Sequence, residues 1–136
     1  MHEHFDHTAD LGIRATAPDL ANLFVEMAHG LTSAMIDRPE TILEAEHIAL
    51  DLADGDRDFL LFDWLRAILH LYEERRFLGR RFEVTIDRDH LKADIWGEPV
   101  DADRHPLSHE VKAVTYHGLK IEQNAEGWLA EAIVDI

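Results

Sequence analysis

The chain contains no cysteine among its 136 residues, and this absence removes several classes of chemistry. Disulfide bonds, zinc sites built on thiolates and cysteine nucleophiles are all excluded. No apolar run approaches the ~20 residues that a membrane-spanning helix requires. The N-terminal residues lack the basic and apolar regions of a signal peptide, so we expect a cytoplasmic protein.

Basic residues are also scarce, because 13 Lys and Arg stand against 28 Asp and Glu and leave a net charge of −15. Stable binding of nucleic acid or of an anionic membrane needs a basic patch, so neither is expected. Hydrophobic residues make up 46% of the chain, which is enough for a buried core, and no repeat or linker interrupts them. We therefore expect one domain over residues 1–136, with its oligomeric state left open.

The spacing of apolar residues predicts an α+β protein. Alternation of apolar and polar residues predicts six strands, over residues 10–17, 41–52, 82–86, 91–95, 110–122 and 128–135. Helical spacing predicts one helix that starts at Pro18 and Asp19 and a second, largely apolar helix that Asp58 caps and that runs to about Arg76. Short turns join the later strands, which indicates a mostly antiparallel sheet with two helices packed on one face.

Two acidic positions near the ends of the chain are candidate ligands for a hard cation. Asp10 opens the first predicted strand in the run HTADLG, either as a turn residue bonded to the local main chain or as a cation ligand. Asp135 precedes Ile136 at the end of the last predicted strand, either solvated or held beside the terminal carboxylate. The spacing by itself does not show that Asp10 and Asp135 meet.

Several other polar residues have an ordinary and a functional interpretation. Lys112 lies on one face of a predicted strand and points to solvent, to a protein partner or to a phosphate. His2 and His4 are expected to be mobile. A stripe on the second helix is expected to form an exposed ion pair: Asp63, Arg66 and His70. One loop is expected to be solvated and is a weak metal candidate: Glu98, Asp101, Asp103, His105, His109 and Glu110.

Four segments, in this order along the chain, resemble the archease family. They are HTADLGIRA at residues 7–15, DFLLFDWLRAIL at 58–69, GEPVDADRHP through HEVKAVTYHGL at 97–119, and IVDI at 133–136. The resemblance spans the whole chain. It implies the fold of that family, a strand-helix-strand-strand module with an inserted helical segment, which agrees with the α+β prediction.

The resemblance also implies a function that composition does not show. Archeases are non-catalytic activators of the RtcB-type RNA ligase, which joins a 2′,3′-cyclic phosphate or 3′-phosphate end to a 5′-hydroxyl end. That ligase uses GTP and manganese and is first guanylylated on a histidine. The family promotes this guanylylation and multiple turnover in tRNA splicing or RNA repair, and it also carries a broader description as chaperone-like.

The functional residues of the family fall on particular positions of this sequence. The resemblance implies that Asp10, Asp135 and Ile136 bind a divalent cation, seen as calcium in the family. Mg²⁺ and Mn²⁺ also suit a ligand set made only of oxygen. The lysine implicated in activation falls on Lys112. Ala67 departs from the family, which often has a glutamate there, so any partner contact of that glutamate is lost.

Two other functions stay open on the sequence. A metal-dependent phosphoester hydrolase would use Asp10 with His7 or His117 around an ion, and the isolated protein would turn over substrate. A cation-stabilised binding module would gain stability from the metal and leave any ligase unaffected. Ligase activation instead predicts no turnover by the isolated chain and a large change in the rate of the ligase at substoichiometric amounts.

Overall fold

The computed structural model describes the main chain at residues 1–7 and 10–136 and the side chains at residues 1–5 and 10–136. The described part contains two α-helices, one short 3-10 helix (η1) and eight strands. In chain order the elements are β1 (His2–His7), β2 (Asp10–Ala17), α1 (Leu20–Met35), η1 (Pro39–Thr41), β3 (Glu46–Ala53), α2 (Arg57–Arg75), β4 (Phe77–Asp87), β5 (His90–Pro99), β6 (Ala113–Val114), β7 (Lys120–Asn124) and β8 (Gly127–Asp135).

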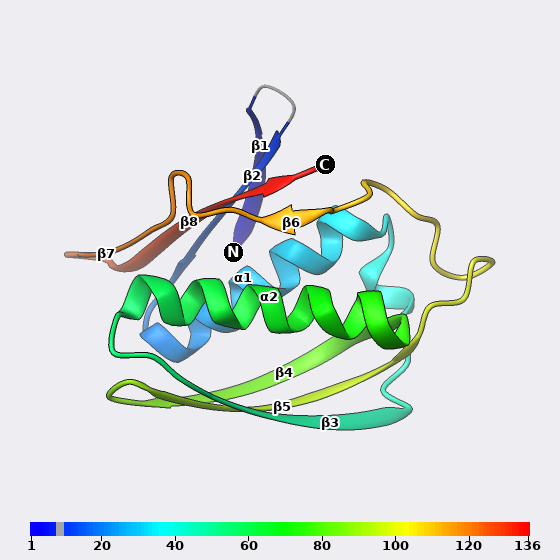
Figure 1. Ribbon diagram of the computed structural model, residues 1–136, viewed down its shortest axis with the longest axis horizontal. Coiled ribbons are helices and arrows are strands. Elements are labelled where there is room, and N and C mark those ends of the chain that lie inside the picture. Colours follow the sequence, from blue (N-terminus) through cyan, green and yellow to red (C-terminus); the bar gives the residue numbers. More distant parts are fainter. Residues whose placement is uncertain (8–9) are drawn as a thin grey trace.

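The strands form two antiparallel sheets, and both helices lie between them (Figure 1). The first sheet has the order β1-β2-β8-β6, and β7 pairs with another part of β8. The second sheet has the order β3-β5-β4. α1 contacts β1, β2 and β8 on one side and β4 on the other, while α2 contacts β3, β4, β6 and β7. The helices therefore pack on one face of each sheet, and the predicted α+β class is confirmed.

The hydrophobic core fills the space between the two sheets and around the helices. Ile13 of β2 and Ala132 of β8 are paired in register, and both are fully buried. Trp64 of α2 is also fully buried, and its Nε1 donates a hydrogen bond to the main-chain oxygen of Phe24 in α1 at 2.9 Å. This bond satisfies the one polar atom of the indole and joins the two helices inside the apolar core.

Each of the two α-helices begins at an aspartate that caps its N-terminus. The Asp19 carboxylate accepts a hydrogen bond from the main-chain nitrogen of Asn22 at 2.8 Å, at the predicted start of α1. At α2 the cap is Asp56, which accepts from the main-chain nitrogens of Asp58 at 2.8 Å and Phe59 at 3.3 Å. The prediction that Asp58 caps this helix is wrong, because Asp58 already lies in the first helical turn.

Two predicted strands are shorter than the alternation suggested. The strand predicted over residues 41–52 begins only at Glu46, because Pro39–Thr41 forms a 3-10 turn and Ile42 is buried in the core. The strand predicted over residues 110–122 is divided into β6 and β7, which both pair with β8. The turn between them contains Gly118 with φ +69°, a conformation that glycine adopts without strain.

The first strand, β1, is not predicted by the sequence, and the two histidines expected to be mobile are held on it. Both Nε2 atoms lie close to the hydroxyl oxygen of Ser33 in α1, at 3.1 Å from His2 and 3.3 Å from His4. His4 Nε2 also lies 3.0 Å from the main-chain oxygen of Gly30. Polar contacts with α1 hold this edge strand in place. Because these contacts involve polar side chains, the sequence of β1 does not show the apolar alternation by which a strand is predicted.

Two glycines on neighbouring strands allow β4 and β5 to approach closely where the ladder shifts register. Gly79 of β4 pairs with Gly97 of β5, next to the shift between Gly79 and Arg81. A Cβ on Gly97 would lie 1.9 Å from the main-chain oxygen of Leu78, which cannot move without disturbing the strand. Position 97 therefore requires glycine for steric reasons, although its φ is not positive.

Replacing Gly97 with alanine is expected to lower the free energy of unfolding by about 2 kcal/mol or more, because the strands must separate. Gly55→Ala is the matched control, since a Cβ there meets no heavy atom within 4 Å. We expect that control to change stability by no more than about 0.5 kcal/mol. Urea unfolding of both variants measures the difference, and equal losses would contradict the steric argument.

Candidate functional site

The pairing of β2 with β8 brings the two candidate acids together. Asp10 at the start of β2 is the register partner of Asp135 at the end of β8. Ile136 follows directly, and the C-terminus lies beside the N-terminal hairpin (Figure 1). We call Asp10, Asp135 and Ile136 the acidic tip. All three are partly exposed, so the tip is open to solvent or to a ligand.

The acidic tip places two like charges opposite each other, whereas the same two strands pair opposite charges a few residues away. Opposite charges directly across an antiparallel pair stabilise it, and like charges destabilise it, by roughly 0.2–1 kcal/mol. Arg14 pairs with Glu131, and its Nε lies 3.1 Å from the Glu131 carboxylate. The Asp10–Asp135 pair instead sets two carboxyl groups opposite each other. Such a local conflict is typical of a functional position.

The contact between the two acids changes the acidity of Asp135. The pKa of its carboxyl is raised above the ordinary value, chiefly by a hydrogen bond shared with Asp10, then by partial burial and by repulsion from the Asp10 charge. The positive charge of Lys112 acts in the opposite direction. The main-chain nitrogen of Lys112 donates to the main-chain oxygen of Asp135 at 2.8 Å, which keeps this lysine next to the tip.

The donor atoms of the tip suit a hard cation. Carboxylate oxygens are the ligands that Ca²⁺, Mg²⁺ and Mn²⁺ take, and a cation between Asp10 and Asp135 would relieve their repulsion. Among the described side chains, no group of three or more His, Cys, Asp or Glu is arranged to hold a metal ion. Within the described residues, the carboxylates at the tip are those of the Asp10 and Asp135 side chains, next to Ile136. The side chain of His7 lies outside the described residues.

Lys112 and Ala67 lie on the same cavity, although they are far apart in the sequence. A groove of about 500 Å³ runs between α2 and β6, and both residues line it together with Arg66 and His70. The Lys112 side chain is exposed, which agrees with the expectation that it faces solvent, although the residue lies just before β6. The small side chain of Ala67 therefore lines a groove that Lys112 also lines.

The loop that was expected to be solvated instead contains a buried ionic cluster. Glu98 is 6% exposed and His105 is fully buried, so the prediction is wrong for these two residues. Asp103, His109 and Glu110 are exposed as expected, and Asp101 is partly exposed. One sequence signal could have found the cluster: Arg104 is the only Lys or Arg among the acids of residues 98–110.

The cluster is built around the Glu98 carboxylate. Arg104 binds it with both terminal nitrogens, at 2.7 and 2.8 Å, and the main-chain nitrogen of Leu43 donates to it at 2.7 Å. His105 accepts from the main-chain nitrogen of Asp101 at Nδ1, so its ring proton lies on Nε2 and points to Glu98 at 3.1 Å. These donors, with Arg104 first, lower the pKa of Glu98 to about 2. This cluster ties the loop to the fold, and both oxygens of the Glu98 carboxylate accept hydrogen bonds within it.

The polar stripe of α2 also differs from its prediction. Arg66 and His70 are exposed, but no ion pair joins either of them to Asp63 within the described part of the chain. His70 pairs with Glu74 at 3.1 Å. Partial burial and a hydrogen bond with Asp54 raise the pKa of Asp63, and the positive charge of Arg66 offsets this only in part.

The whole chain matches a known family. The model of the archease protein family aligns with residues 2–136. The chain belongs to the archease family. It is 37% identical to protein archease of Methanopyrus kandleri, with 98% of each chain covered. It is 33% identical to protein archease of Pyrococcus abyssi, with 98% of this chain and 97% of the relative covered.

Solved structures support the same archease fold. The solution structure of a protein from Methanobacterium thermoautotrophicum matches with a TM-score of 0.87 at 32% identity, covering 99% of this chain and 98% of the other. The crystal structure of an archease from Thermotoga maritima, described as a possible chaperone, matches with a TM-score of 0.59. At 19% identity that second likeness shows the fold alone. Neither helix of the described chain is both long and apolar enough to cross a membrane.

Glu98→Gln is expected to lower the free energy of unfolding at pH 7 by roughly 1–3 kcal/mol, because it removes the charge that Arg104 binds. The folded pKa lies below the ordinary value of 4.5, so the charge stabilises the fold above pH 4.5. This contribution is lost as the pH falls from 4.5 towards about 2. Urea unfolding from pH 7 to pH 3 should show the two proteins converging, and a constant difference would contradict the assignment.

Asp135→Asn is expected to stabilise the protein at neutral pH in the presence of a chelator. The folded pKa of Asp135 is raised, so the wild type loses stability as the pH rises from the ordinary value through the raised one. The variant should lack this loss. Thermal unfolding in EDTA between pH 3.5 and 8 measures it, with the exposed Glu126→Gln as the control. A variant less stable than wild type at every pH would show that the two acids do not repel.

Proposed function

We propose that this chain is a non-catalytic activator of an RtcB-type RNA ligase, promoting its GTP-dependent guanylylation and its multiple turnover. The observation that carries the proposal is the register of β2 and β8, which sets Asp10 against Asp135 beside Ile136. These are the positions that the resemblance assigns to the divalent cation. Membership of the archease family supports the same role.

The acidic tip would hold the cation through the carboxylates of Asp10 and Asp135 and the main-chain carboxylate of Ile136. Ca²⁺ fits this oxygen set, and Mg²⁺ or Mn²⁺ also fit. A bound cation supplies positive charge that offsets the repulsion of the two acids. The protein's own contribution is to present these carboxylates at an open end of a sheet, where the active site of a partner can reach them.

Lys112 would act next to the tip. Its main chain is bonded to Asp135, and its exposed side chain carries a positive charge close to the acidic pair. An ammonium group there can contact an acidic residue of the ligase or a phosphate of the bound nucleotide. The tip and Lys112 would thus enter the partner together.

The charge of the chain supports a transient complex with the ligase and not with RNA. An RNA ligase needs a basic groove for its substrate, and a partner with a net charge of −15 is drawn to such a surface. Added salt should slow this association. The same charge disfavours stable contact of the chain itself with RNA. A cytoplasmic location fits this role.

The test is guanylylation of a ligase from the same source, with labelled GTP and Mn²⁺, with and without a tenth of an equivalent of this protein. A strong rise in guanylylated ligase over several equivalents is expected. Asp10→Asn and Asp135→Asn should each reduce the activated rate by about tenfold or more, because each removes a charged ligand of the cation. Glu126→Gln, an exposed acid away from the tip, should activate as well as wild type.

Three results would count against the proposal. No rise with folded protein and a competent ligase would exclude activation. Full activity of Asp10→Asn would exclude the acidic tip as the active part. Hydrolysis of a phosphoester by the isolated chain in the presence of Ca²⁺, Mg²⁺ or Mn²⁺ would favour the hydrolase alternative.

A further inference from the structure

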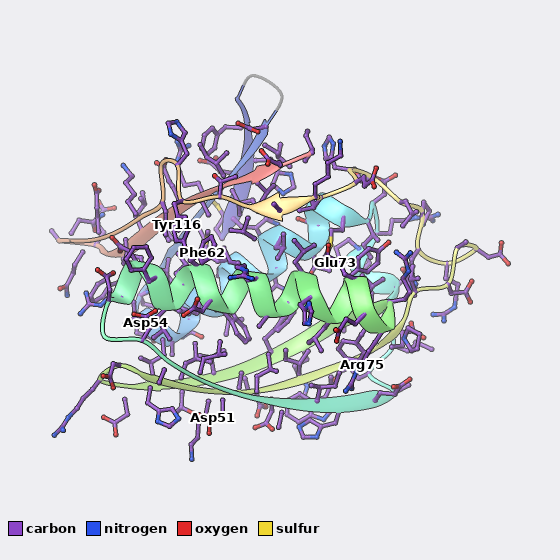
Figure 2. The ribbon with its side chains drawn as sticks, in the orientation of Figure 1. Asp51, Asp54, Phe62, Glu73, Arg75 and Tyr116 are labelled. Atoms are coloured by element: carbon purple, nitrogen blue, oxygen red, sulfur yellow. The ribbon has the colours of Figure 1, made fainter. Side chains whose placement is uncertain are left out.

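An open pocket lies at the N-terminal end of α2, between this helix and the segment that joins β6 to β7. Its volume is about 520 Å³, and it is separate from the acidic tip. Figure 2 shows Tyr116, Phe62 and Asp54 around this end of α2. The lining combines aromatic and acidic side chains: Asp54, Asp56, Asp58, Phe59, Asp63, Tyr116 and Leu119.

The aromatic wall of the pocket is exposed but held rigidly. Tyr116 is 60% exposed and Phe59 is 44% exposed, which is unusual for side chains of this size. The Tyr116 ring stacks on the ring of the buried Phe62, with centroids 4.0 Å apart and planes at 15°. The Phe59 ring contacts the Tyr116 ring edge-on, with centroids 5.3 Å apart. A fixed, solvent-facing ring of this kind is typical of an interaction hot spot.

The acidic wall carries negative charge that its surroundings offset only in part. Among the described residues, no ion pair involves any of the four aspartates that line the pocket. Partial burial raises the pKa of Asp63, and the neighbouring Asp54 raises it further. Partial burial likewise raises the pKa of Asp58, and Asp56 raises it further. Arg57 and Arg66 are near enough to offset this only in part. A positive group in the pocket would relieve the repulsion.

We propose that this pocket is a docking site for an arginine or lysine side chain on a basic segment of the partner protein. The inference rests on the proposed function, and it names the surface through which the ligase is held. An aromatic face next to carboxylates is the arrangement that binds a guanidinium or ammonium group, by cation–π contact and charge-assisted hydrogen bonds. A phosphate group would be repelled by the four acids, which disfavours RNA as the occupant.

The position of the pocket agrees with this assignment. Asp63 lines this pocket and also the groove that contains Lys112, so the two cavities adjoin along α2. The partner surface next to a basic side chain seated on Tyr116 would lie near Lys112, and Lys112 is bonded through its main chain to Asp135 of the tip. One partner can therefore occupy the pocket and reach the tip. Contacts in the pocket would set the affinity for the ligase, and the acidic tip would change the rate of its guanylylation.

The experiment measures ligase guanylylation as a function of the concentration of this protein, together with direct binding to the ligase by calorimetry. Tyr116→Ala removes the aromatic face, and Asp63→Lys places a positive charge in the pocket. Leu107→Ala is the control for the first, since Leu107 is 61% exposed elsewhere on the surface. Glu40→Lys is the control for the charge change, at an exposed position in η1.

The two pocket variants are expected to raise the half-maximal concentration and the dissociation constant by about tenfold or more, with the same maximal rate. Both controls should stay within about twofold of wild type. Asp63→Asn relieves repulsion without risk to the fold, so it should weaken binding while its thermal stability is equal or higher. Binding of Asp63→Lys should also lose part of its salt dependence.

The outcomes separate this inference from the proposed function. Wild-type activation with unchanged half-maximal concentrations in the folded pocket variants would overturn the docking site alone. If the wild type binds the ligase without activating it, and the pocket variants bind more weakly, the docking site is supported and the proposed function is overturned. A wild type that neither binds nor activates the ligase would overturn both.

Discussion

The pairing of β2 with β8 is the constraint on which the rest of the molecule depends. It joins the two ends of the chain in the middle of the larger sheet, with β1 on one side and β6 and β7 on the other. Leu11 and Ile13 face the core from one strand, and Ala132 and Val134 face it from the other. A slip of one residue would turn these side chains to solvent, so burial fixes the register. That register then sets Asp10 opposite Asp135.

The molecule uses its acidic residues in two different ways. Around Glu98, an arginine, a histidine and a main-chain N–H satisfy one buried carboxylate, which fastens a loop to the fold. At the acidic tip and in the pocket beside Tyr116, carboxyl groups face each other without a full complement of positive charge. The first arrangement serves structure, whereas neighbouring carboxyl groups on an open surface are suited to a cation or to a basic partner.

Prediction from the sequence succeeded where local signals were strong. The apolar stripe of α1 and its cap at Asp19, the β4–β5 hairpin and the β7–β8 hairpin all depend on contacts near in sequence. It failed where distant contacts decide the local structure. β1 is a strand because it pairs with β2 and touches α1, and His105 is buried because Glu98 and Arg104 enclose it with Asp101.

The sequence by itself determined the fold class, the two helices, the acidic charge and, through resemblance, the candidate positions Asp10, Asp135, Ile136 and Lys112. Tertiary structure alone decided that Asp10 and Asp135 are neighbours, that Lys112 stands beside them, and that Tyr116 and four aspartates share one pocket. The reason is physical. Side-chain spacing along a strand or helix reports one face of one element, whereas a site forms only when long-range pairing fixes how separate elements meet.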